Sequence, residues 1–481
     1  MLHPLHHILH NHLIKNYLLH FFAFVNKLIS QNLPYHPPRV HAESTPTSPA
    51  WTRGGYGVVI KNDVKEGHPD FRVDTITPCR KKENNMYKIQ EKRRMEQKHI
   101  VLIVTGGIAA YKAIDLAGSI VKEGYSVQTV LTKNALNFVS ALDFKAITHS
   151  PVYTEMFTND DPIPHITLAD WADLVVVAPA TANLIAKAAH GLADDLASSL
   201  LLAHPKPVLW VPAMNVHMYN HPATQENLQT LLQRGNYVLE PVTGMLACGY
   251  EGKGKFPPVE EILSAIKTYL HYSRDLIGKK VLITAGGTAE PIDPMRTVTN
   301  RSSGKTGLAL ARTAALRGAE VNLVYADVSV SIPYYLNSAV YTQTAAEMAQ
   351  AVEKLAPEMD IIVMAAAVSD FTPLQPSAEK IKKSAALELK LRQTEDILQK
   401  LGQIKKTGQK LIGFAAETEN LSSNAKTKLE QKNLDLIIAN DIQVCGRDET
   451  EMILLTKNSQ EQIKADKFQA AHLIWDKIKE L

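Results

Sequence analysis

Residues 173–184 read DLVVVAPATANL, and this stretch decides how the chain folds. Its first half is a run of β-branched, apolar residues, which is typical of a strand buried on both faces within a parallel sheet. Residues 208–215, VLWVPAMN, repeat the pattern, and each run ends in small and polar residues. Open α/β sheets bind ligands beyond the carboxyl ends of their strands. We therefore expect Thr181, Asn183 and Asn215 to line one pocket, where small residues let a flat ring approach the backbone.

A glycine turn follows the strand expected at residues 99–104. Residues 105–112 read TGGIAAYK and open a helix. Backbone N–H groups at such a turn can hold a phosphate at the helix N-terminus, so Gly106 and Gly107 are candidate cofactor contacts. A Gly-Gly turn is more often plain turn chemistry. The chain also contains no G-x-G-x-x-G, so a standard dinucleotide fingerprint is not supported.

The size and composition of the chain restrict its class. A length of 481 residues exceeds one ordinary core, so we expect two or three domains. The net charge of +3 is too small to argue for nucleic acid or a membrane surface as a partner. Three cysteines are too few for a disulfide framework and indicate a reducing compartment, which predicts a cytoplasmic protein. The sequence shows no zinc-ligand cluster.

Residues 1–94 differ from the rest of the chain. They hold nine of the 18 histidines, clusters of proline with serine or threonine, and no sustained period. The apolar stretch 17–25 is shorter than the about 20 residues that a membrane span needs, and a signal peptide would need a basic start and a cleavage site. Scattered histidines could bind a metal. We interpret the segment instead as an extension of low order, consistent with translation from upstream of the true start.

The remainder alternates strands and helices in two successive units, which predicts an α/β protein with two doubly wound, Rossmann-like domains at 95–273 and 274–481. In the first, strands are expected near residues 99–104, 126–131, 173–178 and 207–211, and helices near 108–122, 181–189, 195–203, 222–234 and 259–271. In the second, strands are expected near 279–284, 320–326, 360–366, 410–415 and 434–438, with a long loop up to Ser303 and helices near 305–317 and 466–480.

Residues 302–306, SSGKT, look like the end of a P-loop. Position 299 holds threonine where that motif has its leading glycine, and no strand directly precedes the turn. A Walker A site is therefore not supported. Gly304 and Lys305 nevertheless open a helix after two serines, which is compatible with a phosphate cradle.

Three polar residues of the first half are candidates for catalysis. His165 lies before the strand expected near 173–178, and a lone histidine is usually a surface or capping residue. Cys248 lies in a loop with three glycines, where a cysteine is not a core residue and can act as a proton donor or nucleophile. Asn215 stands at a strand end, where its amide can fix a carboxylate.

Lysines gather in the second half of the chain. Asp370 follows a predicted strand, and the run EKIKK at 379–383 begins nine residues later. Such a run is ordinarily a solvated surface. Lys428 and Lys432 are spaced to share one helix face. With Asn300 and the SSGKT turn, these side chains would suit a triphosphate, for which positioning and charge neutralisation dominate catalysis.

Together, these stretches resemble a known family. From about residue 97 onward, the chain resembles the bacterial bifunctional proteins of coenzyme A biosynthesis, in which phosphopantothenoylcysteine decarboxylase is fused to phosphopantothenate–cysteine ligase. The resemblance covers roughly four fifths of the chain, in the family's order. It rests on TGGIAAYK (105–112), His165 followed by WADL (171–174), APATANL (178–184), PAMN (212–215), ACG (247–249), TAGGTAEPIDPMR (284–296), residues 300–307, AEKIKK (378–383), GFAAET (413–418) and KNLDLI (432–437).

The resemblance implies a flavodoxin-like first domain that binds FMN and a ligase domain that binds CTP with Mg²⁺ or Mn²⁺. The ligase would activate 4'-phosphopantothenate as an acyl-cytidylate, which L-cysteine attacks. The decarboxylase would convert the product to 4'-phosphopantetheine, with FMN oxidising the cysteinyl thiol and later returning the electrons. The resemblance also implies a homo-oligomer, in which trimers of the decarboxylase core are paired through the ligase domain into a dodecamer.

By the same resemblance, the site residues fall into three groups, and the metal ligands are not assigned. The catalytic group is His165, Asn215, Cys248, Lys380, Asn300 and Arg296. The FMN contacts are Gly106, Gly107, Thr132, Thr181, Asn183 and Met214. The nucleotide contacts are Ala366, Asp370, Lys380, Glu395, Asp396, Ile397, Leu398, Phe414, Lys428 and Lys432. Asn215 would hold the substrate carboxylate, Cys248 would protonate the enethiol, and Lys380 would be the catalytic lysine of the ligase.

The chain departs from the family's pattern in four places, the first being residues 1–94, which have no counterpart in the family. Residues 254–256 read GKF where the family usually has GRM, and Arg301 stands where a histidine is common. The segment after Asp441 is altered, with CGRD at 445–448, and no contact is carried over there.

Two other functions remain open. One is a flavin decarboxylase that acts on a different cysteinyl substrate and carries an unrelated second domain, which the ligase motifs disfavour. The other is a regulatory FMN-binding subunit without turnover. The joint presence of His165, Asn215 and Cys248 disfavours this second alternative.

Overall fold

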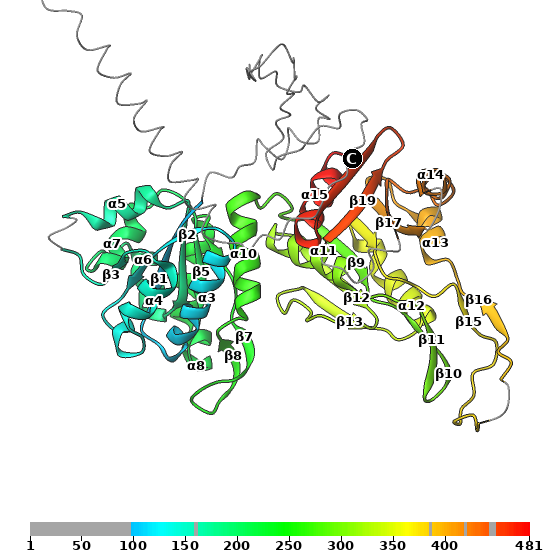
Figure 1. The fold of residues 1–481 in the computed structure, drawn as a ribbon, viewed down its shortest axis with the longest axis horizontal. Coiled ribbons are helices and arrows are strands. Elements are labelled where there is room, and N and C mark those ends of the chain that lie inside the picture. Colours follow the sequence, from blue (N-terminus) through cyan, green and yellow to red (C-terminus); the bar gives the residue numbers. More distant parts are fainter. Residues whose placement is uncertain (1–97, 158–161, 384–386, 418–420, 442–448) are drawn as a thin grey trace, which may run out of the picture. The chain divides into compact units, whose positions relative to one another are not determined.

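The computed structural model describes residues 98–157, 162–383, 387–417, 421–441 and 449–481. Within these ranges the chain forms two α/β units, each built around one large sheet (Figure 1). The extension expected at residues 1–94 and the altered segment at 445–448 lie outside the described residues. No helix in the described part of the chain is both long and apolar enough to cross a membrane.

Six parallel strands form the sheet of the first unit, in the order β3-β2-β1-β4-β5-β6. Their bounds are β1 His99–Val104, β2 Ser126–Leu131, β3 Val152–Tyr153, β4 Leu174–Ala180, β5 Val208–Pro212 and β6 Tyr237–Val238. The strand order reverses between β1 and β4, which creates the crevice where doubly wound sheets bind ligands. The predicted doubly wound fold is confirmed for this unit.

Helices cover both faces of this sheet. Ile100 and Leu102 of β1 pack into one apolar cluster, whereas Val101 and Ile103 pack into another on the opposite face. The first cluster includes residues of α3 (Lys112–Lys122), α4 (Ala141–Thr148) and α10 (Val259–His271). The second includes residues of α5 (Pro164–Trp171), α6 (Ala182–His190), α7 (Leu196–Ala203) and α9 (Pro222–Gln233). Burial on both faces explains why the strands are continuous apolar runs.

The structure adds elements to this unit that the sequence analysis missed. They are β3, β6, α4, α5, the short helix α8 (Val216–Asn220) and an antiparallel hairpin of β7 (Val242–Met245) and β8 (Glu251–Lys255). His165 consequently lies in the first turn of α5, directly after Pro164, a residue suited to the start of a helix. Cys248 lies in the turn between β7 and β8.

Eight strands form the sheet of the second unit, in the order β13-β12-β9-β14-β17-β18-β19-β20. Their bounds are β9 Lys280–Ala285, β12 Glu320–Tyr325, β13 Ser338–Tyr341, β14 Ile361–Met364, β17 Lys410–Glu417, β18 Leu436–Asp441, β19 Glu449–Leu455 and β20 Gln460–Asp466. One face packs on α11 (Lys305–Leu316) and α15 (Lys467–Lys479). The other packs on α12 (Ala345–Leu355), α13 (Ile397–Ile404) and α14 (Leu421–Gln431).

Several features of the second unit differ from the expectations, including the strand β13 and the helices α12 and α13, which were not expected. The stretch expected as a loop up to Ser303 contains an antiparallel hairpin of β10 (Ala289–Asp293) and β11 (Arg296–Thr299). The strands β19 and β20 run antiparallel and extend an otherwise parallel sheet. Lys432 lies just beyond the end of α14, but its N–H donates to the carbonyl of Lys428 at 3.0 Å, so the helical spacing of the two lysines is kept. A further antiparallel pair joins β15 (Phe371–Pro373) to β16 (Leu391–Gln393).

Candidate functional site

The carboxyl ends of β1 and β4 are tied together by hydrogen bonds. The hydroxyl of Thr105 donates to the carbonyl of Pro179 at 2.7 Å and accepts from the N–H of Thr181 at 3.0 Å. A Cβ at Gly107 would lie 3.9 Å from the methyl group of Thr181, and no other heavy atom lies within 4 Å of it. The N–H of Thr132 donates to the carbonyl of Val104 at 3.1 Å, which brings the end of β2 to the same edge.

The residues at this edge fit a flavin. The space beside Gly107 is open, and a Cβ at Gly106 would come within 2.4 Å of Asn134, so the chain needs glycine there for the backbone to approach closely. The side chains of Ile108 and Tyr111, directly after these glycines, are more than half exposed. Backbone N–H groups, open space and apolar side chains are what a flat, phosphorylated cofactor requires. The structure thus brings Gly106, Gly107, Thr132 and Thr181 to one edge of the sheet.

Asn215 links the end of β5 to the hairpin of β7 and β8. Its side-chain oxygen accepts from the N–H of His217 at 2.8 Å and thereby caps α8. Its side-chain amide donates to the Sγ of Cys248 at 3.1 Å. The neighbouring Met214 donates its N–H to the carbonyl of Gly254 at 3.0 Å, which holds the hairpin against the strand end. Asn215 and Cys248, 33 residues apart, are therefore one contact pair.

The Cys248 thiol is exposed, and its pKa is lowered. Hydrogen bonds from the backbone N–H of Tyr250 and from the amide of Asn215 lower the pKa of this thiol. An exposed thiol in a turn, held by a side-chain amide, can give up a proton to a bound molecule.

His165 carries a buried nitrogen without a protein partner. Its Nδ1 is shielded from solvent and has no hydrogen-bond partner among the described residues. Leaving a buried polar atom unpaired costs about 1–3 kcal/mol, and Trp210 in the core of the same unit also has a buried, unpaired nitrogen. No described contact joins His165 to Asn215 or Cys248. Another predicted residue of this unit, Asn183, lies in the first turn of α6.

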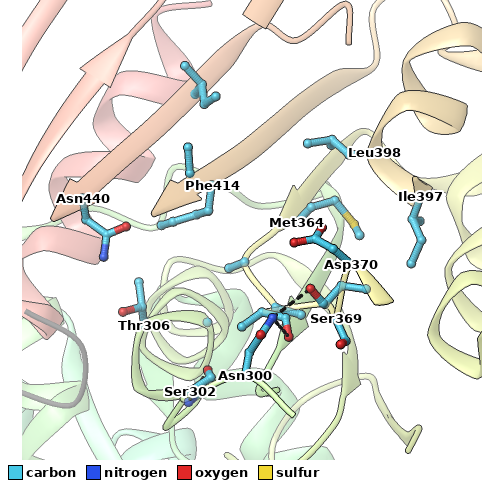
Figure 2. Close-up of a pocket in the computed structure, with 18 of the residues that line it drawn as sticks. Asn300, Ser302, Thr306, Met364, Ser369, Asp370, Ile397, Leu398, Phe414 and Asn440 are labelled. Atoms are coloured by element: carbon cyan, nitrogen blue, oxygen red, sulfur yellow. Dashed lines mark hydrogen bonds between the residues drawn. The ribbon is translucent and has the colours of Figure 1, made fainter. Parts of the chain in front are cut away.

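A cavity of about 620 Å³ lies at the carboxyl edge of the second sheet (Figure 2). Figure 2 shows Asp370, Ile397 and Leu398 along one side of it and Thr306 and Asn440 along the other. The amide of Asn300 donates to the carbonyl of Val368 at 3.0 Å, which fixes its orientation. The volume is in the range of small-molecule sites, about 300–1,000 Å³.

Nine of the ten predicted nucleotide contacts line this cavity, and so does Asn300. The nine are Ala366, Asp370, Glu395, Asp396, Ile397, Leu398, Phe414, Lys428 and Lys432. The SSGKT turn also lines it, and Gly304 has a φ of +71° at the start of α11. A Cβ there would lie 2.4 Å from Val328, so this turn requires glycine.

The cavity is rich in charge. Five basic side chains line it, namely Arg301, Lys305, Lys428, Lys432 and Lys467, against three acidic ones, Asp370, Glu395 and Asp396. Lys432 pairs with Asp396 at 2.7 Å. Burial raises the pKa of Asp396, but Lys432, the backbone N–H of Gln399 and the charge of Lys428 together outweigh burial, so the pKa lies below its usual value. An excess of cations with nearby carboxylates suits an anionic ligand that carries a metal ion.

Two predicted ligase residues lie elsewhere. Lys380 and Arg296 do not line the cavity. Arg296 lies at the start of β11, where it is hydrogen-bonded to Asp293 and to the carbonyl of Ile381. The structure therefore places Arg296 next to the Lys380 segment.

Some lining residues were missed at the sequence level. Asn440, Thr450 and Met452 line the cavity from β18 and β19, and Lys467 lines it from the start of α15. The polar pair that ends β18, Asn440 and Asp441, was the available signal, because a strand that ends in polar residues marks the carboxyl edge of a sheet. The antiparallel return of β19 gave no such signal.

Comparison with known proteins agrees with both units. A family model described as Flavoprotein matches residues 88–271, and the DNA/pantothenate metabolism flavoprotein C-terminal domain matches residues 276–481. The coenzyme A biosynthesis bifunctional protein CoaBC of Bacillus subtilis is 46% identical over 357 residues, which cover 73% of this chain and 88% of that protein. Its namesake from Mycobacterium bovis is 42% identical over 360 residues, covering 72% and 86% respectively. A crystal structure of a CoaBC C-terminal domain aligns with 43% of this chain and 97% of its own at 36% identity, with a TM-score of 0.38.

The fold, the two sites and the two family matches define the chain as a flavoprotein enzyme with a second, ligand-binding α/β unit. It belongs to the family of bifunctional coenzyme A biosynthesis proteins. The chain is a bifunctional enzyme with decarboxylase and ligase activities, as the sequence predicted.

Proposed function

We propose that the chain converts 4'-phosphopantothenate to 4'-phosphopantetheine in two steps. Residues 274–481 ligate L-cysteine to 4'-phosphopantothenate at the expense of CTP, and residues 95–273 decarboxylate the product with FMN. The observation that carries the proposal is the cavity of the second unit, whose lining contains nine of the ten side chains expected to contact a nucleotide.

The ligase chemistry follows from charge. Lys428, Lys432 and the N-terminus of α11 neutralise a triphosphate, and Phe414 offers an apolar face to the base. The amide of Asn300 is held by Val368 at the same cavity and is placed to bind the acyl group. Positioning and charge neutralisation of this kind are the main contributions that proteins make to phosphoryl and nucleotidyl transfer.

The carboxylates of the cavity fit Mg²⁺ or Mn²⁺ carried by CTP. Asp370, Glu395 and Asp396 line the cavity, but the described residues contain no cluster of three or more metal-ligating side chains. Mg²⁺ is usually held by one or two carboxylates together with substrate phosphates and water. Such a cation would neutralise charge on the triphosphate, with no separate protein cage.

In the decarboxylase, different residues at the edge of the first sheet bind the cofactor, bind the substrate and deliver a proton. FMN, held at Gly106, Gly107, Thr132 and Thr181, supplies the oxidation and reduction that loss of CO₂ requires. Asn215 fixes the substrate carboxylate, and Cys248 delivers the final proton from its Sγ. His165, in the first turn of α5, binds the substrate and orients it toward the cofactor.

The decisive experiment is product analysis with the whole chain. With phosphopantothenate, cysteine and CTP, we expect CMP and pyrophosphate, CO₂ and 4'-phosphopantetheine, and a yellow protein. Omission of CTP should stop ligation but not the decarboxylation of added phosphopantothenoylcysteine. Ligation with ATP at the same rate would contradict the CTP assignment. A yellow protein that releases no CO₂ would indicate a regulatory subunit instead.

The domain boundary at 273/274, the homo-oligomer with trimeric decarboxylase cores and the cytoplasmic location remain predictions. The two separate sheets, one on each side of the boundary, support the division. Light scattering and sedimentation of the purified chain would give the number of subunits.

A further inference from the structure

Asp293 is a buried carboxylate at the turn of the β10–β11 hairpin. Only 2% of the residue is exposed. Its Oδ1 accepts from the N–H groups of Met295 at 2.8 Å and of Arg296 at 2.9 Å. Its Oδ2 accepts from the Nε of Arg296 at 2.9 Å and also from the Nη2 of that side chain. The carboxylate therefore holds both the backbone and the guanidinium of Arg296.

The same carboxylate also holds the segment that carries Lys380. The N–H of Ile381 donates to Oδ2 of Asp293 at 3.1 Å, across 88 positions of sequence. The guanidinium of Arg296 completes the link by donating to the carbonyl of Ile381 at 3.0 Å. The N–H of Ser377 donates to the carbonyl of Ile292 at 2.9 Å. Residues 377–381 are thus fastened to the hairpin at three points.

This cluster is ionic. The hydrogen bonds from Arg296 hold the pKa of Asp293 well below its usual range, so the carboxylate stays charged at neutral pH. Hydrogen bonds to a charged group are shorter and about twice as strong as those between neutral groups. Met295 and Lys380, which adjoin residues held by this buried carboxylate, are both exposed. A charged, buried acceptor of this kind is suited to fixing geometry.

We propose that Asp293 is a positioning residue of the ligase, which holds the Arg296 guanidinium and the Lys380 segment together in their working arrangement. The inference rests on the ligase roles proposed for Arg296 and Lys380. Asp293 itself touches no substrate in this scheme. It acts through the two residues that it holds, and a small misplacement of a catalytic group can cost about 10²-fold in rate.

The lining of the cavity separates an effect on ligase turnover from an effect on CTP binding. None of Asp293, Arg296 and Lys380 lines the cavity of the second unit. Loss of Asp293 should therefore reduce the turnover of the ligase without weakening CTP binding. A merely structural residue would instead lower stability and all kinetic constants together.

The test measures ligase kinetics of the whole enzyme carrying Asp293→Asn, which keeps the volume but removes the charge and one acceptor. We expect kcat to fall about 10- to 100-fold, while KM for CTP and the decarboxylation of added phosphopantothenoylcysteine stay within twofold. In an Arg296→Gln background, Asp293→Asn should add less than twofold, because residues that act as one unit are not additive. Asp360→Asn is the matched control, since Asp360 also accepts a backbone N–H, that of Lys280 at 2.8 Å, but at the opposite end of the sheet.

Wild-type kcat for Asp293→Asn would overturn the inference, and so would full additivity with Arg296→Gln. If Arg296→Gln and Lys380→Gln are both fully active, the proposed ligase roles fail and the inference fails with them. If those two variants are impaired and Asp293→Asn is not, the inference alone fails. Should Asp293→Asn not fold, hydrogen exchange of residues 377–383 in Arg296→Gln gives the answer. The inference requires faster exchange there and unchanged exchange in β9, and unchanged exchange in both would overturn it.

Discussion

The side-chain amide of Asn215 donates a hydrogen bond to the Sγ of Cys248 at 3.1 Å. The two residues come from different elements, the N-terminus of α8 and the turn between β7 and β8. This contact joins a group suited to holding a carboxylate with a thiol whose pKa is lowered by hydrogen bonds from Tyr250 and Asn215. The proposed roles of Asn215 in substrate binding and of Cys248 in proton delivery would therefore meet at this one contact.

Cys248→Ser should separate loss of CO₂ from completion of the reaction. A serine hydroxyl has a far higher pKa than this thiol, so it should not protonate the enethiol. We expect one equivalent of CO₂ per active site and an enethiol product that is two hydrogen atoms short of 4'-phosphopantetheine. Rapid-quench CO₂ measurement and mass spectrometry of the product test this expectation, and full turnover by the serine variant would sink it.

Asn215→Ala should raise the pKa of the Cys248 thiol, because one of the hydrogen bonds that favour the thiolate is lost. The pH midpoint for alkylation of Cys248 by iodoacetamide should move upward, so that alkylation at neutral pH becomes slower. Mass spectrometry of the Cys248 peptide distinguishes this thiol from Cys79 and Cys445. Met245→Ala, an exposed change in the same hairpin, should leave the midpoint unchanged. An unchanged midpoint in Asn215→Ala would show that the amide has no influence on the thiol.

Apolar patterning predicted the sheets well. Strands such as β4 and β5 are buried on both faces, and their continuous apolar runs predict this burial from the sequence alone. The hairpin of β10 and β11 was missed because Pro291 and Pro294 interrupt its pattern, and proline is a poor strand residue. The helix α5 was missed because its short sequence has little segregation of apolar and polar residues.

Where candidate site residues follow strands, their position at the edge of the sheet could be predicted, but their contact partners could not. Thr181 and Asn215 stand at strand ends, and the parallel sheet brings such ends to one edge. The contact of Asp293 with Ile381 joins residues 88 positions apart, which belong to two separate segments outside the eight-stranded sheet. No periodicity encodes such a contact, because it depends on how two irregular segments pack together.

Lys432→Met should weaken CTP binding by about tenfold or more, since hydrogen bonds to charged groups contribute about 1.5–3 kcal/mol. Lys432 lines the cavity, and its side chain is only 23% exposed. Lys426→Met on the exposed side of α14 is the matched control and should bind CTP normally. Isothermal titration with CTP and Mg²⁺ measures both. Equal affinities for the two variants would remove Lys432 from the nucleotide site.

His472 should make the protein less stable as the pH falls. Burial and the nearby charge of Arg317 lower the pKa of His472 to about 3 in the folded state, whereas it is 6.5 for the ordinary side chain. The unfolded chain therefore binds more protons between pH 6.5 and pH 3, so stability is lost as the pH falls through that window. In the wild type, the His472 ring stacks on Tyr272 with the ring centroids 3.7 Å apart. His472→Phe keeps an aromatic ring at this position but cannot bind a proton. It should reduce the loss of Tm between pH 7 and pH 4.5 by about 5 °C.

The control for this prediction is His190→Gln, because His190 is exposed at the end of α6. Its Tm should follow the same pH dependence as the wild type. A wild-type pH dependence in His472→Phe would show that His472 is not the titrating group. Scanning calorimetry or fluorimetry at several pH values measures each Tm.

Lys380→Gln should abolish most ligase activity while Lys383→Gln does little. Lys380 adjoins Ile381, whose backbone is held by Asp293 and Arg296, whereas Lys383 lies beyond these contacts and is exposed. A lysine that neutralises charge developing on the acyl-cytidylate matters for rate more than for fold. Removal of one such preorganised contact typically costs about 10² to 10³ in turnover.

Flavin absorbance, Tm and decarboxylation of added phosphopantothenoylcysteine should be unchanged in both variants. Equal and small effects of the two substitutions would mean that residues 379–383 are a solvated surface, and the catalytic charge would then have to come from the cavity lysines, Lys428 and Lys432.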